Sequence, residues 1–160
     1  MIRDLIEKTR SYRRFHQDFK IELETLKELV ELARLSAAAG NLQPLKYMLA
    51  NEPEKNDTIF PNLGWAGYLK DWPGPGEGER PSAYVIVLGD KRICKSFGCD
   101  HGIASQNILL GAGEKGLGGC MIGSVNRERL RKDLDISDHF EILLVLALGK
   151  PKESVVLEEV

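Results

Sequence analysis

The densest cationic stretch of the chain is Lys8-Thr-Arg10-Ser11-Tyr-Arg13-Arg-Phe15, which is followed by no acidic residue before Asp18. Arginine forks, a hydroxyl and backbone N–H groups are the donors that hold a phosphate, and this loop can supply all three. An isolated basic run is nevertheless more often a solvated loop than a binding site. The stretch is therefore a candidate anion site that needs support from the rest of the sequence.

Two further segments could contact a flat, polar ligand. Residues 36–44, Ser-Ala-Ala-Ala-Gly-Asn-Leu-Gln-Pro, contain small side chains that let a ligand approach the backbone, and two amides that offer paired donors and acceptors. Residues 117–124, Leu-Gly-Gly-Cys-Met-Ile-Gly-Ser, lead from an expected strand into a turn whose N–H groups can point at an acceptor. Each pattern alone also fits an ordinary helix end or strand end.

Two patterns that could indicate other chemistry fail on their context. Gly111-Ala-Gly113-Glu-Lys-Gly116 has the spacing of a dinucleotide fingerprint, but it follows an expected helix and precedes a strand, which is the reverse of the required order. We interpret these glycines as close-packing positions in a helix that ends at Gly116. The three cysteines lack zinc-ligand spacing, so we expect no metal and interpret them as reduced thiols in a cytoplasmic protein.

The apolar pattern predicts the elements that must position these segments. Helices are expected at 2–8, 23–37 with Gly40 as its stop, 101–115 with Asp100 as its cap, and 127–133; strands are expected at 45–50, 83–88, 117–122 and 142–148. This order predicts one α+β or α/β domain over residues 1–160. Residues 51–81 are weakly periodic and rich in proline and tryptophan, which predicts a lid or binding loop; the alternative is a mobile surface excursion.

Composition excludes several classes of protein. The chain has 160 residues, 42% of them apolar and 29% charged, so it can fold without disulfides or a metal. Its net charge of −2 argues against bulk attraction to nucleic acid or to a membrane surface. The longest apolar runs are too short to span a bilayer, and the charged N-terminus does not fit a secretory signal.

Taken in order, these segments resemble the FMN-dependent nitroreductase family. The likeness rests on Arg10-Ser-Tyr-Arg13-Arg-Phe15, on Ala39-Gly-Asn41-Leu-Gln43-Pro44, on residues 100–110 before Gly116-Leu-Gly-Gly-Cys-Met-Ile-Gly123, and on Leu146-Ala-Leu-Gly-Lys-Pro. It covers nearly the whole chain except residues 51–81. The resemblance implies an α+β fold with a central, mostly antiparallel sheet flanked by helices, built as an intertwined homodimer with FMN at the interface.

The resemblance also implies roles for particular residues. The phosphate and the pyrimidine edge of FMN would be held by Arg10, Ser11 and Arg13, with Arg13 as the cation near N1 and O2. The ring and ribityl chain would be lined by Ala38, Ala39, Asn41 and Gln43, and the ring would be packed by Met121, Ile122 and Gly123. Family members usually continue into a tail that returns a basic residue to the phosphate; here Lys150 or Lys152 would substitute, or the tail is missing. No catalytic side chain is needed, because the flavin carries hydride transfer.

The implied activity is transfer of hydride from NAD(P)H through FMN to a nitro compound, a quinone or a similar small-molecule acceptor. Reductive dehalogenation and flavin breakdown are alternatives on the same fold, and a flavin-binding protein without turnover, for storage or sensing, is an alternative of another class. We expect Trp65 and Tyr68 to lie near the acceptor as part of a lid. The alternative is that Trp65 and Trp72 fill the core beneath the loop.

Overall fold

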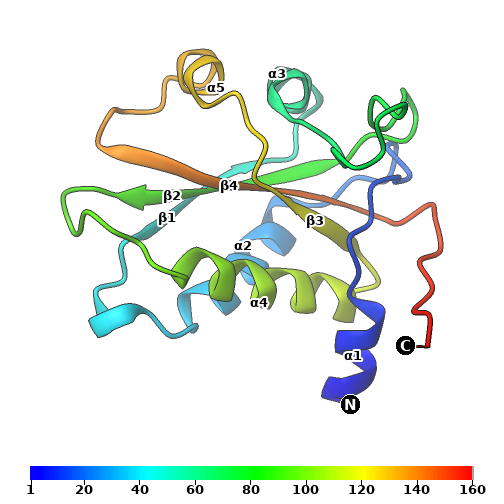
Figure 1. Cartoon of the computed structure of the whole chain (residues 1–160), viewed down its shortest axis with the longest axis horizontal. Helices are drawn as coiled ribbons and strands as arrows, with labels where there is room; N and C mark the ends of the chain where they lie inside the picture. The colour runs from blue at the N-terminus through cyan, green and yellow to red at the C-terminus, as the bar shows by residue number, and fades with distance from the viewer. Residues whose placement is uncertain (160) are drawn as a thin grey trace.

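The computed structural model describes residues 1–159, and their centre is a four-stranded antiparallel sheet (Figure 1). Its strands are β1 (Leu45–Ala50), β2 (Ala83–Asp90), β3 (Gly118–Ile122) and β4 (Phe140–Gly149). They lie in the order β1-β2-β4-β3, and every neighbouring pair is antiparallel. The expected α+β class with a mostly antiparallel sheet is therefore confirmed, and β3 is an edge strand.

Helices cover both faces of this sheet. The helices are α1 (Ile2–Lys8), α2 (Leu23–Arg34), α3 (Pro53–Ile59), α4 (Asp100–Glu114) and α5 (Arg127–Asp133), with short 3₁₀ turns at η1 (Ala39–Asn41) and η2 (Phe60–Asn62). In Figure 1, α2 and α4 lie below the sheet, and α3 and α5 lie above it. Because both faces are covered, β2 is buried at every position, which explains why its sequence is apolar without alternation.

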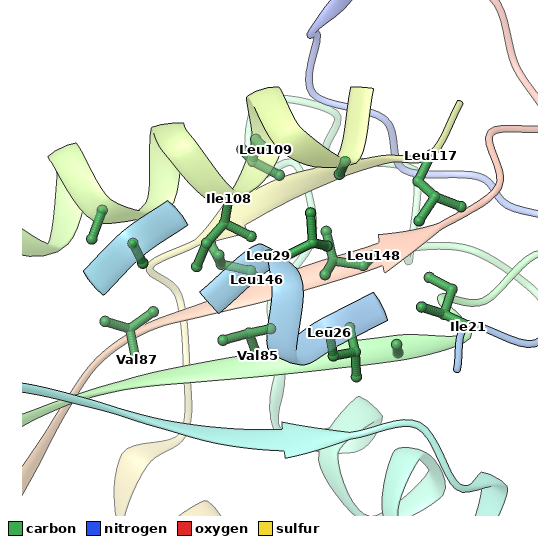
Figure 2. Packing of buried hydrophobic residues seen from close by; sticks show 14 residues of the cluster. Ile21, Leu26, Leu29, Val85, Val87, Ile108, Leu109, Leu117, Leu146 and Leu148 are labelled. Carbon is green, nitrogen blue, oxygen red and sulfur yellow. The ribbon is translucent and has the colours of Figure 1, made fainter. Parts of the chain in front are cut away.

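The larger core lies between the sheet and the α2–α4 pair (Figure 2). Leu26 and Leu29 of α2 and Ile108 of α4 pack against Val85 of β2 and Leu146 of β4, and all five side chains are fully buried. Two of the predicted glycine roles are visible here. A Cβ at Gly111 would collide with Leu32, and Gly116 ends the helix with a φ of +71°.

A second core lies on the opposite face, beneath α3 and α5. Its buried members include Ile59, Tyr84, Ile86, Leu130 and Trp65. Residues 51–81 are thus not a single structureless excursion, since they contribute α3, η2 and part of this core. The weak periodicity arose because α3 is only seven residues long, with few apolar positions to show a helical pattern.

Other element boundaries shift by a few residues. The helix expected to reach residue 37 ends at Arg34, and η1 follows it before the sheet begins. Asp100 is the first residue of α4, and its side chain makes no cap hydrogen bond within that helix, contrary to the expectation. Within the described residues, no helix is both long enough and apolar enough to cross a membrane.

Candidate functional site

The basic segment, residues 8–15, lies along the edge of β3 that pairs with no other strand of the sheet. Ser11 forms a parallel β-bridge with Gly119, and the Tyr12 N–H donates to the Gly119 carbonyl at 3.1 Å. The close approach requires glycine in the strand, because a Cβ at Gly118 would lie 2.5 Å from the Tyr12 ring. The residues expected to hold the phosphate are therefore placed directly beside the strand expected to contact the flavin ring.

The two arginines of this segment differ in what they contact. The Arg10 guanidinium donates to the carbonyls of Thr9 at 2.8 Å and Ile6 at 2.7 Å, so it caps the end of α1. Among residues 1–159, the Arg13 guanidinium donates only to the Ser11 carbonyl, at 3.2 Å, and it lies 5.7 Å from the centre of the Tyr68 ring. Within residues 1–159, Arg13 forms no ion pair with a carboxylate. Its charge is therefore available to a bound anion.

Backbone N–H groups in the same segment already hold an anionic oxygen. Glu153 Oε1 accepts the N–H of Arg13 at 2.5 Å and the N–H of Arg14 at 3.1 Å, and the Glu153 carboxylate lies 3.5 Å from the Arg14 guanidinium. No sequence pattern points to Glu153, because its position depends on how the chain after β4 folds back. The contact demonstrates that these N–H groups point at one position suited to negative charge.

The end of β3 and the residue that follows it differ in how far they are exposed at this edge. Met121 is 37% exposed, Gly123 is also exposed, and the Ile122 side chain is buried in the second core. Ile122 can therefore offer only its backbone to a ligand at the surface. Beside them, burial raises the pKa of the Cys120 thiol to about 12, against a smaller opposing effect of the Arg13 charge. Cys120 is thus a neutral thiol and not a nucleophile.

The expected basic residue after β4 is exposed but lies near another aromatic side chain. The Lys150 ammonium is 5.3 Å from the centre of the Phe19 ring, and the Lys150 carbonyl accepts the His16 N–H at 2.9 Å. The Lys152 ammonium lies 3.5 Å from Glu79. Neither ammonium contacts Arg10 or Ser11 through a hydrogen bond in the described part of the chain.

The loop after α2, residues 36–44, brings together the second group of expected ligand-binding residues, and α4 holds this loop in place. The Asp100 Oδ1 atom accepts the Ala39 N–H at 3.0 Å, so the carboxylate fixes this loop and does not cap its own helix. Gln43 donates to Asn41 at 2.8 Å, and both have positive φ, which non-glycine residues adopt only when held. Ala38 and Gln43 line a cavity of about 270 Å³ at this end of the molecule.

The two groups lie at opposite ends of α4. Thr9, next to the basic segment, lies against Gly113 near the end of α4, whereas Ala39 is bonded to Asp100 at its start. Thirteen residues of helix separate these contacts, which corresponds to about 20 Å along the axis. Figure 1 shows the same separation, with η1 and α1 at the two ends of the helical layer. One chain therefore does not bring the two groups together.

The aromatic residues expected in a lid are also separated from one another. Trp65 is only 9% exposed, packs in the second core, and its ring centre is 5.9 Å from that of Phe60. Trp65 thus fills the core, which is the arrangement stated as the alternative. Tyr68 is 70% exposed and lies beside Arg13, so it alone of the two could meet a ligand at the surface.

Comparison with known proteins identifies the family of this chain. A sequence profile described as the Nitroreductase family matches residues 6–68 and 83–150. The chain belongs to the Nitroreductase family. A protein of Archaeoglobus fulgidus, provisionally named an NADH dehydrogenase/NAD(P)H nitroreductase, is 27% identical over 153 residues, which cover 91% of this chain and 83% of that protein. A Bacillus subtilis protein provisionally named NAD(P)H nitroreductase YodC is 25% identical over 85% of this chain and 65% of its own length.

Solved structures of the Nitroreductase family share the fold. A Streptococcus pneumoniae family protein superposes with a TM-score of 0.81 at 16% identity, covering 99% of this chain and 94% of that one. An FMN-dependent nitroreductase from Clostridium difficile gives a TM-score of 0.78 at 21% identity, covering 99% and 92%. The family match ends at residue 68 and resumes at residue 83, so residues 69–82 are an internal stretch that departs from the family pattern.

Proposed function

We propose that this chain is an FMN-dependent oxidoreductase that takes hydride from NAD(P)H and passes it to a nitro compound, a quinone or a similar small acceptor. Membership of the Nitroreductase family supports this, as do the names of relatives that mention NAD(P)H and of a structure described as FMN-dependent. The observation that carries the proposal is the position at the edge of β3 where two backbone N–H groups converge on the Glu153 carboxylate, next to the Arg13 guanidinium, which pairs with no carboxylate within residues 1–159.

The residues present fit FMN. The Glu153 carboxylate occupies a position that attracts negative charge, which is the property that a phosphate requires. The glycine pair at the start of β3 lets the basic segment pack directly against the strand, with the Tyr12 ring over Gly118. Ser11 is thereby held beside the strand that would contact the flavin ring. FMN, when bound, supplies the hydride transfer itself.

The residues of the chain would position the ring and set its electrostatic environment. Arg13 would place a cation beside the N1 and O2 edge, Met121 would present its exposed side chain to one face, and Gly123 would offer an unobstructed backbone. Because Cys120 is neutral and buried, it would take no part as a nucleophile. Tyr68, exposed beside Arg13, is the aromatic side chain that we propose contacts the acceptor.

We further infer that the working form is a homodimer with FMN between the subunits. The separation of the two groups along α4 supports this, because the small-residue loop of one copy could reach the basic segment of another. Exposed apolar side chains on the helical layer also favour a partner: Leu35 is 66% exposed, Leu42 52% and Ile103 39%. A C2 pair would bury this surface and build two equivalent sites.

An absorbance spectrum of the purified protein, recorded anaerobically before and after NADPH, tests the proposed activity. We expect a flavin spectrum that bleaches on addition of NADPH and returns when a quinone or nitroaromatic compound is added. A flavin spectrum that NADH and NADPH both leave unchanged would instead support a binding protein without turnover. A protein that takes up no FMN on titration would contradict the proposal altogether.

Mixing two inactive variants tests the shared site. Arg13→Gln damages the basic segment, and the double variant Asn41→Ala, Gln43→Ala damages the loop after α2. In a mixed dimer with shared sites, one site carries both defects and the other carries none. Unfolding and refolding an equal mixture should therefore restore about a quarter of the wild-type FMN sites. If both groups of a site come from one chain, mixing restores nothing.

A further inference from the structure

A cavity of about 480 Å³ lies away from both groups described above. Its walls come from residues 17–20, from residues 51–57 around the start of α3, and from residues 80–84 at the start of β2. None of its lining residues belongs to the basic segment, to β3 or to the loop after α2. Arg80 and Ser82 lie between the two parts of the chain that match the family.

Three residues that line this cavity each carry a buried polar atom that has no hydrogen-bond partner in the described part of the chain. The atoms are Asn56 Oδ1, Arg80 Nε and Ser82 Oγ, and the Ser82 residue is only 7% exposed. The structure has seven such side-chain atoms in all across residues 1–159, so nearly half of them belong to residues that line one cavity. Buried polar atoms normally find partners, because leaving one unpaired is costly.

The free atoms have defined hydrogen-bonding roles. Asn56 donates through Nδ2 to the Ser82 carbonyl at 2.8 Å, which leaves Oδ1 as an acceptor directed elsewhere. The Arg80 guanidinium stacks on the Phe60 ring at 4.3 Å and has no ion pair among residues 1–159, so its Nε–H remains a cationic donor. The Ser82 hydroxyl can both donate and accept. The cavity is therefore complementary to an occupant that carries both a hydrogen-bond acceptor and a hydrogen-bond donor.

Charges of both signs surround these atoms. Lys20 and Arg80 are cationic, and Asp18, Glu52 and Asp57 are anionic. The buried Tyr84 phenol lines the same cavity: burial raises its pKa, and the nearby Arg80 charge lowers it while Asp57 raises it further. Because the charges of Arg80 and Asp57 both shift the pKa of Tyr84, a cation and an anion lie close to the same wall of the cavity.

We propose that this cavity binds a small zwitterion of the size of a free amino acid. Its carboxylate would accept from Arg80 Nε–H and the Ser82 hydroxyl, and its ammonium would donate to Asn56 Oδ1 in the field of Asp57. Water could complete the hydrogen bonds but would leave the Arg80 charge without a counterion. The cavity carries one more carboxylate than cation, so a neutral or basic amino acid fits better than an acidic one.

Titration of the purified, FMN-loaded protein with L-lysine tests the proposal, with 1,5-diaminopentane and hexanoate as matched probes. The diamine lacks the carboxylate, and hexanoate lacks both ammonium groups. We expect L-lysine to give saturable NMR shifts at the Asn56 side-chain amide and the Ser82 backbone amide, with each matched probe at least about tenfold weaker. Equal binding of all three probes, or no saturable shift at these positions, would overturn the proposal.

Variants locate the binding. Ser82→Ala removes one hydroxyl and should weaken L-lysine binding about fivefold, whereas Arg80→Met should weaken it tenfold or more. Ser137→Ala, an exposed serine outside the cavity, is the matched control and should bind as wild type does. Unchanged binding in Ser82→Ala, or a crystal soaked in L-lysine that shows only ordered water in the cavity, would refute the assignment. FMN content should be the same in all these variants.

Discussion

Replacing Arg13 by glutamine separates cofactor binding from stability. In the part of the chain that the structure describes, the Arg13 side chain makes one hydrogen bond, to the Ser11 carbonyl, and a distant contact with the exposed Tyr68 ring. Such contacts are worth about 1 kcal/mol or less each, so the free energy of unfolding of the cofactor-free protein should fall by about 1 kcal/mol. A charged donor to FMN contributes more, about 1.5–3 kcal/mol, which corresponds to about a 10- to 150-fold increase in Kd.

The assay is a fluorescence titration of FMN into cofactor-free protein, paired with urea unfolding of the same sample. Arg129→Gln is the matched control, because Arg129 is exposed on α5 and pairs with Asp133 at 3.6 Å, far from the basic segment in the fold. We expect the control to lose neither FMN affinity nor much stability. Wild-type FMN affinity in Arg13→Gln would refute the reasoning, and so would a loss of affinity that merely followed a large loss of stability.

Three further predictions rest on other contacts. Asp100→Ala leaves the Ala39 N–H without its partner and should lower the free energy of unfolding by about 1–3 kcal/mol in urea, with weaker FMN binding; an unchanged urea midpoint would contradict the bond. Trp65→Ala should lower the free energy of unfolding by about 3–5 kcal/mol and leave the ratio of nitroaromatic to quinone rates unchanged. Tyr68→Ala should change that ratio and hardly alter Tm, and the reverse pattern would indicate that Trp65 is part of a lid. Hydrogen bonds from Arg92 hold the pKa of Asp90 below its usual value. The ionised Asp90 therefore stabilises the fold above pH 3.8, and this stabilisation is lost as the pH falls further. The difference in Tm between wild type and Asp90→Asn should shrink in that acidic range, and a constant difference would exclude this linkage.

The sequence predicted the elements whose pattern is long and regular. The helices around Leu26 and Ile108 and the apolar strands around Val85 and Leu146 were placed within a few residues, because each buries a continuous apolar surface. Helix α3 was missed, since a short helix on the surface needs only one or two apolar contacts and leaves no periodic signal.

The candidate site was predictable as separate segments but not as an arrangement. Local composition pointed to Arg13 and to Asn41, yet no local pattern could reveal that their two segments contact opposite ends of α4, about 20 Å apart along the helix axis. The role of Asp100 was misjudged for a related reason, because a carboxylate at a helix start usually bonds within its own helix and here it bonds to a distant loop. The cavity at Ser82 likewise combines three stretches that only the fold brings together.

The basic segment covers part of the edge of β3 that pairs with no other strand of the sheet. An edge strand with free N–H and C=O groups is a template on which other chains can pair, and residues 11 and 12 cover that edge here. The same backbone carries Arg13, which we propose binds FMN, so a bound cofactor would also hold this covering segment in place. Protein without bound flavin should therefore be cleaved faster by proteases near its N-terminus and should aggregate faster. The supply of cofactor would then help to set the lifetime of the protein in the cell.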